Sequence, residues 1–134
     1  MSEYQDAKKQ ALKDERLYGL FETLRERAYQ TGEFDKLAAA DNLGEVSKLA
    51  LAWDSNIRKE ILDKAKEQLT GADKSAGDKL SKIVLDDLKG LDKLAKAKSK
   101  DEIPAASAVL RGHVLEFVQL EPSKLADKYG VGDL

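Results

Sequence analysis

Residues 78–97 read DKLSKIVLDDLKGLDKLAKA, and their apolar side chains recur at steps of three and four positions. Side chains at this spacing fall on one face of an α-helix, so the stretch predicts an amphipathic helix with a single buried face. The pattern extends outward to a helix over residues 74–97. Its apolar stripe consists of Leu80, Ile83, Val84, Leu88, Leu91, Leu94 and Ala95.

Three more helices are predicted, over residues 3–29, 43–70 and 101–120. The stripe of the second consists of Leu43, Val46, Ala50, Trp53, Ile57 and Ile61, and that of the fourth of Ile103, Ala106, Leu110, Val114 and Phe117. Short helical turns are expected over residues 34–40 and 124–128. Because short connections force neighbouring helices to run antiparallel, we expect an all-α, up-down-up-down four-helix bundle that forms one domain over residues 1–134.

The composition excludes several classes of function. The 134 residues include no cysteine, which rules out thiolate zinc sites, iron–sulfur clusters and thiol nucleophiles. The 23 basic and 25 acidic residues leave a net charge of -2, whereas a nucleic-acid-binding domain is usually strongly basic. The longest uncharged stretch, Ile103 to Leu110, is far shorter than the roughly 20 apolar residues of a membrane-crossing helix. We therefore expect no cofactor, no nucleic acid and no direct membrane span.

The charge is unevenly distributed along the chain. Residues 72–100 contain 8 basic and 5 acidic side chains, a balance of +3, and residues 101–134 contain 3 and 6, a balance of -3. On a helical wheel, five lysines of the basic segment lie within about 60° of one another, opposite the apolar stripe. They are Lys82, Lys89, Lys93, Lys96 and Lys100. Such a row is either a solvated face or a docking surface for an acidic partner, and docking through it would be salt-sensitive.

His113 is the only histidine, and it lies about 50° from the centre of the apolar stripe of its helix. One interpretation is a half-buried ring with one nitrogen hydrogen-bonded, and the other is the phosphoryl-carrying histidine of a phosphotransfer bundle. A carboxylate-bridged di-iron site needs a Glu-x-x-His pair from each of two helices, so a single histidine cannot supply it.

Asp87 and Trp53 both lie among apolar positions of their helices. An unpaired buried carboxylate is costly, so Asp87 needs a partner. The candidates are Arg58, Arg111, His113 and a tyrosine hydroxyl. The functional alternative, a carboxylate poised for acid–base chemistry, lacks a nucleophile or a second carboxylate to work with. Trp53 is predicted to pack in the core.

Three runs of the sequence carry a family resemblance: residues 42–49 (NLGEVSKL), residues 82–96 (KIVLDDLKGLDKLAK) and residues 110–120. Together they resemble the PsbQ-like extrinsic proteins of photosystem II, and among these the diatom-type subunit. The resemblance covers residues 42–121. It implies a four-helix bundle that is no enzyme by itself and is a monomer when free.

The resemblance also implies a function and a place in the cell. Such a protein would lie in the chloroplast thylakoid lumen, bound to the membrane through the intrinsic subunits, and other extrinsic subunits, of photosystem II. There it would shield the manganese–calcium centre and help to retain calcium and chloride. Lys89, Lys93, Lys96 and Lys100 would be its leading docking residues. A phosphotransfer bundle using His113 and a helical adaptor of unknown partner remain as alternatives.

Overall fold

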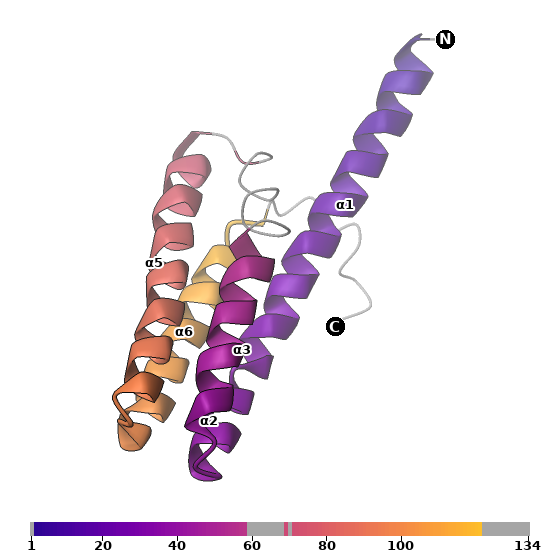
Figure 1. Ribbon diagram of the computed structural model, residues 1–134. Coiled ribbons are helices and arrows are strands. Elements are labelled where there is room, and N and C mark those ends of the chain that lie inside the picture. Colours follow the sequence, from indigo (N-terminus) through magenta and orange to yellow (C-terminus); the bar gives the residue numbers. More distant parts are fainter. Residues whose placement is uncertain (1, 59–68, 70, 122–134) are drawn as a thin grey trace.

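The computed structural model describes residues 2–58, 69 and 71–121, with the backbone alone for residues 2–14 and 17. All regular structure in these ranges is helical (Figure 1). The elements are α1 (Ser2–Gln30), α2 (Gly32–Ala39), α3 (Leu43–Asn56), α5 (Gly71–Lys96), the short 3-10 turn η2 (Lys100–Glu102) and α6 (Ile103–Val118). The predicted all-α class is confirmed.

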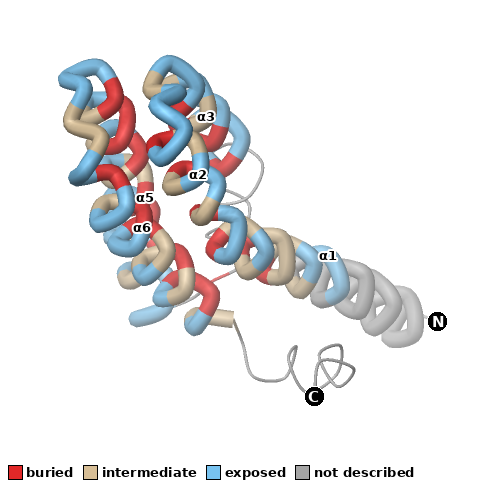
Figure 2. Tube along the Cα trace, turned by 90° about the horizontal axis from the view of Figure 1, so that it is seen from below, coloured by how far each residue is buried: buried red, intermediate tan, exposed pale blue. Residues whose placement is uncertain are grey.

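The long helices pack against one another as a bundle. Helix α5 packs on α3 and on α6, α1 packs on α6, and the short α2 contacts both α3 and α6. Buried positions follow the inward sides of these helices (Figure 2). The core that they enclose joins Phe21 and Leu24 of α1 to Trp53 of α3, Leu88 of α5 and Phe117 of α6.

Several helix boundaries differ from the predicted ones. Helix α3 ends at Asn56, and Leu69, inside the predicted second helix, is not helical. Helix α5 begins at Gly71, three residues before the predicted start, and α6 ends at Val118. The turn expected over residues 34–40 is the two-turn helix α2, and the fourth helix is preceded by η2, so the α-helical part begins at Ile103 instead of Asp101. The part of the predicted second helix over residues 59–68, which holds Ile61, and the turn over residues 124–128 lie outside the described residues.

The buried face of α5 is rotated from the predicted stripe toward α3. Ile83, predicted to be buried, is 38% exposed, and Leu80 and Leu94 are only half-buried. In their place Ser81 and Asp92 are buried. At 100° per residue the shift is about 50°. This rotation arises because α5 packs on both α3 and α6. The positions of these two helices, and not the apolar side chains of α5 alone, determine which side of α5 is buried.

The turn between α5 and η2 is closed by a residue in a left-handed conformation. Lys98 has φ 57°, while the Ser99 N–H donates to the Leu94 carbonyl at 2.9 Å and the Lys98 N–H to the Ala95 carbonyl at 3.1 Å. This hydrogen-bond pair is the Schellman arrangement, in which glycine is the preferred left-handed residue. The turn therefore places a lysine where a side chain is unfavourable.

Lys98→Gly is consequently expected to stabilise the protein by up to about 1 kcal/mol, since it removes the strain of a Cβ at positive φ. Urea denaturation monitored by circular dichroism measures the change. The control is Lys79→Gly in the middle of α5, which should destabilise by about 1 kcal/mol because glycine weakens a helix interior. Equal destabilisation by both substitutions would contradict the left-handed conformation of Lys98.

Candidate functional site

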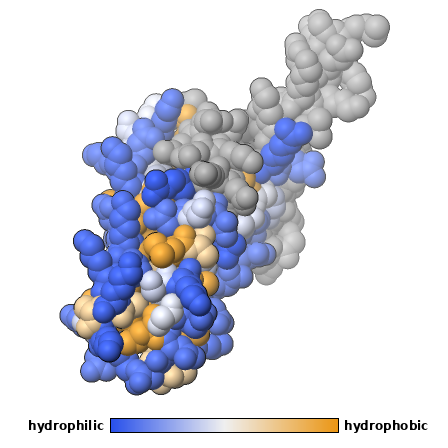
Figure 3. All heavy atoms as spheres, viewed as in Figure 1, coloured by the Kyte–Doolittle hydropathy of each residue, from blue (hydrophilic) through white to orange (hydrophobic). Residues whose placement is uncertain are grey.

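The outer face of α5 presents a row of lysines to solvent. Lys82, Lys89 and Lys93 are exposed, and none of them forms an ion pair with another described residue. Lys96 is also exposed, but its Nζ lies 3.0 Å from Asp92 Oδ2. Hydrophilic side chains accordingly cover the α5 side of the molecule in Figure 3. We refer to Lys82, Lys89 and Lys93 below as the lysine row.

Lys100 does not belong to this row. The helix ends at Lys96, and Lys100 lies in η2 after the left-handed turn, where it is half-buried. The prediction that Lys100 shares the helix face of the other four lysines is wrong, because the helical periodicity on which it rests stops before this residue.

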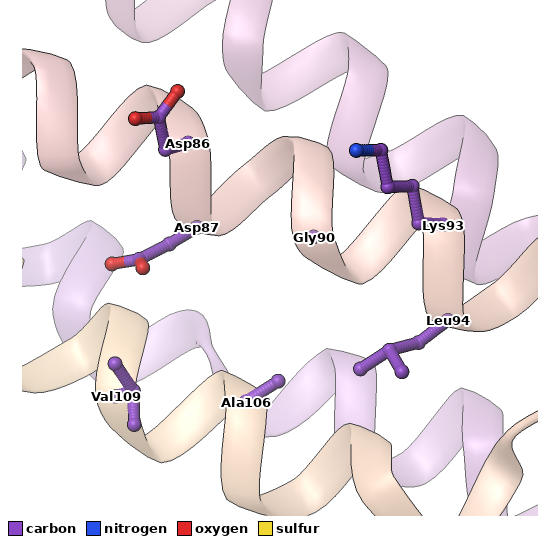
Figure 4. Close-up of a pocket in the computed structure, with 7 residues that line it drawn as sticks. All are labelled: Asp86, Asp87, Gly90, Lys93, Leu94, Ala106 and Val109. Carbon is purple, nitrogen blue, oxygen red and sulfur yellow. The ribbon is translucent and has the colours of Figure 1, made fainter.

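A groove of about 450 Å³ lies between α5 and α6, and Lys93 is the member of the lysine row that lines it. Gly90 and Leu94 line it from α5, and Ala106 and Val109 line it from α6. Figure 4 shows Leu94, Ala106 and Val109 pointing into the space between the helices, while Lys93 and Asp86 point away from it along the rim. Val109 is 50% exposed, so the groove leaves apolar surface uncovered.

Beside the groove, at the lining residue Asp87, a hydrogen bond joins the two helices. His113 Nδ1 lies 2.5 Å from Asp87 Oδ2, and the two side chains are 28% and 18% exposed. Among the partners that the sequence leaves open for Asp87, the structure places His113 at the carboxylate. The half-buried ring with one bonded nitrogen is therefore observed, and it ties α5 to α6.

This contact shapes what His113 can do chemically. With the proton on Nδ1, the ring donates to the carboxylate and only Nε2 is left for other chemistry. A phosphoryl group could then be carried only on Nε2, on the far side of the ring from the Asp87 carboxylate. The observed contact is a hydrogen bond that holds the ring against α5.

Trp53 packs in the core, as its position in the stripe predicts. It is 3% exposed, its ring meets the Phe34 ring edge-on with 5.1 Å between centroids, and the Arg27 guanidinium lies 5.5 Å from the ring centroid. The indole thus joins α1, α2 and α3, and its contacts are those of a structural residue.

Asp92 is a buried group that the sequence pattern does not single out. Its carboxylate accepts a hydrogen bond from the Ser47 hydroxyl of α3 and lies beside the Lys96 ammonium. The Ser47 hydrogen bond, and after it the contact with Lys96, hold the pKa of Asp92 below its usual value of 3.8, although burial acts in the opposite direction. The one sequence signal for this group is the spacing of four between Asp92 and Lys96.

Similar polar contacts join the other packed helices. The Ser107 hydroxyl of α6 donates to Asp35 Oδ1 of α2 at 2.5 Å, and Arg111 Nε donates to the Thr31 hydroxyl at 2.8 Å. Arg111, a candidate partner for Asp87, is therefore engaged on the opposite side of α6. Each of these contacts fixes one helix against another at a defined register.

Within residues 2–58, 69 and 71–121, no group of three or more His, Asp and Glu side chains could hold a metal ion. No helix in the same ranges is long and apolar enough to cross a membrane.

The fold and this surface define a class: a helical bundle that carries a lysine row beside an apolar groove. Compared with models of protein families, with curated proteins and with solved structures, the chain matches none of them.

Proposed function

We propose that this chain is a non-enzymatic docking subunit of photosystem II, akin to the PsbQ-like extrinsic proteins. In this proposal it lies in the thylakoid lumen, binds intrinsic and other extrinsic subunits of the complex, and shields the manganese–calcium centre so that calcium and chloride are retained. The up-down-up-down order of α1, α3, α5 and α6 is part of the proposal. The sequence resemblance over residues 42–121 supports the assignment to this complex.

The lysine row is the observation that carries the docking role. Three ammonium groups on one exposed face, without an ion pair among the described residues, give a local positive field on a chain whose net charge is -2. Such a field raises the rate of encounter with an acidic surface and opposes binding to basic ones. The row spans residues 82–93, about 16 Å of helix at 1.5 Å per residue, which suits a protein surface more than a small ligand.

Replacing Lys82, Lys89 and Lys93 together with glutamine is expected to weaken rebinding to salt-washed photosystem II membranes by about tenfold or more. The physical reason is the loss of three exposed charges, each worth up to about 1 kcal/mol against an opposite charge. Sedimentation of the membranes with graded amounts of protein measures the affinity. Rebinding of the unaltered chain should weaken steeply as the salt concentration rises.

A matched control uses lysines of similar exposure elsewhere. Lys36 of α2 and Lys48 of α3 are highly exposed. Each forms an ion pair with a glutamate three residues earlier, Glu33 and Glu45 respectively. Lys36→Gln with Lys48→Gln should leave rebinding within about twofold, while Lys89→Gln with Lys93→Gln, which removes the same charge, should not. Equal effects of the two double variants would contradict the role of the lysine row. If the unaltered chain fails to rebind at all, the photosystem II assignment fails, and an adaptor for a different acidic partner takes its place.

A further inference from the structure

We infer that the groove between α5 and α6 seats one amphipathic helix of the partner, whose apolar side enters the groove and whose acidic residues lie along the flank above α5. This inference rests on the proposed docking function of the same face and adds the chemistry of the partner. It is carried by the shape of the groove and by the unequal charge of its two banks.

The shape of the groove suits the apolar side of a helix. Gly90 and Ala106, which have no side chain or a small one, line the bottom of the groove without filling it, and Leu94 and Val109 form apolar walls (Figure 4). A Cβ built on Gly90 meets no atom within 4 Å, so the space above this glycine is unfilled by the chain's own side chains. A helix that lays its apolar side into an apolar groove is a common form of recognition, and it would cover the exposed Val109.

The two banks of the groove differ in charge. The α5 bank carries the lysine row, interrupted only by Asp86, whereas the bank formed by α6 exposes the uncharged Ala105 and Gly112 and, seven residues on either side of Val109, the acidic Glu102 and Glu116. Asp87, which points between the helices, is engaged by His113. A helix with acidic residues on the flank above α5 would meet opposite charge, whereas acidic residues on its other flank would meet the like charges of Glu102 and Glu116.

The spacing of the lysines sets the pattern of the partner. Lys82, Lys89 and Lys93 lie seven and four residues apart, which places them in one row over three turns of helix. The complementary helix should therefore carry Asp or Glu at steps of three, four or seven over at least about 12 residues, next to a seam of apolar residues.

Two synthetic helical peptides of about 18 residues, five turns, test this pattern. Both have the same leucine seam and the same number of glutamates, but one carries the glutamates beside the seam and the other opposite it. Isothermal titration with the full chain is expected to show the first peptide binding at least about tenfold more tightly than the second. Equal affinity, or no binding of either peptide, would overturn the inference.

Substitution of two glycines locates the site. Gly90→Gln fills the groove, and Gly19→Gln adds the same side chain at an exposed position of α1; neither position has an atom within 4 Å of the added Cβ. Both variants should be at least as stable as the parent, because glutamine favours helix more than glycine does. Gly90→Gln is expected to weaken binding of the flank-acidic peptide about tenfold and Gly19→Gln to change it less than twofold. Equal affinity of the two variants would place the peptide elsewhere.

The peptide titration and the membrane rebinding assay together separate this inference from the proposed function. Gly90→Gln separates it from self-association. If the peptides behave as expected but the unaltered chain does not rebind to photosystem II membranes, the proposed function fails and the groove assignment stands. If sedimentation shows that the chain dimerises and that Gly90→Gln abolishes the dimer, the occupant is a second copy, and the inference about a partner helix is overturned.

Discussion

Trp53→Ala is expected to lower the free energy of unfolding by about 3–5 kcal/mol, the largest effect of any substitution considered. The indole is 3% exposed, and its removal leaves a cavity where α1, α2 and α3 meet, beside Phe34 and the Arg27 guanidinium. A cavity of this size forfeits dispersion contacts as well as the burial of apolar area. Because domains are typically stable by 5–15 kcal/mol, a large part of the protein's stability would be lost.

Urea denaturation followed by far-ultraviolet circular dichroism measures this loss, with Leu51→Ala as the control. Leu51 lies on the same helix two residues earlier and is 51% exposed, so its truncation should cost less than about 1 kcal/mol. A Trp53→Ala cost no larger than that of Leu51→Ala would mean that the indole does not pack in the core.

Asp92→Ala is expected to destabilise the protein by about 1–3 kcal/mol at pH 7, because the substitution leaves the Ser47 hydroxyl without its carboxylate partner at the contact between α3 and α5. The effect should depend on pH. The pKa of Asp92 in the folded state is lowered from 3.8, mainly by the Ser47 hydrogen bond. A lowered pKa stabilises the fold fully above the unfolded-state value and loses that contribution as the pH falls through the folded-state value. The difference between Asp92→Ala and the parent should therefore shrink below about pH 4.

Asp86→Ala is the matched control for this prediction. Asp86 lies on the same helix but is exposed, so its replacement should change stability by no more than about 0.5 kcal/mol, with no added pH dependence. Urea denaturation at pH 7 and pH 3 compares the two variants. An Asp92→Ala difference that stays the same at both pH values would show that the carboxylate charge contributes nothing to the contact.

The sequence alone predicted the helices well because each has a periodic apolar stripe. Val46, Ala50 and Trp53 of α3 are all buried, as are Ile57 directly after it and Ile103, Leu110, Val114 and Phe117 of α6. The half-buried state of His113 also followed from the helical wheel, and Asp87 was correctly recognised as a group that needs a partner. These features depend on the angular position of a residue on its own helix, which periodicity fixes directly.

Features that involve two helices at once could not be predicted in this way. Ser81 and Asp92 are buried while Ile83 is exposed, because the inward side of α5 is set by where α3 and α6 lie. The partner of Asp87 was one of several possibilities, since nothing in one sequence fixes the register of α5 against α6. The position of Lys100 off the lysine row has a related cause. The helix ends before Lys100 because Lys98 adopts a left-handed conformation, which favours glycine over lysine and so gives no signal in the sequence.

By itself, then, the sequence determined that this protein is all-helical, that it has one core centred on apolar stripes, and that its basic excess lies on one helix, because these are local properties of 3.6-residue periodicity and of charge. Only the tertiary structure decided that Lys93 of the lysine row lines an apolar groove, that His113 is the partner of Asp87 beside this groove, and that Asp92 is held by Ser47. Each of these contacts depends on the relative register and rotation of two helices, which packing sets and no single helix encodes.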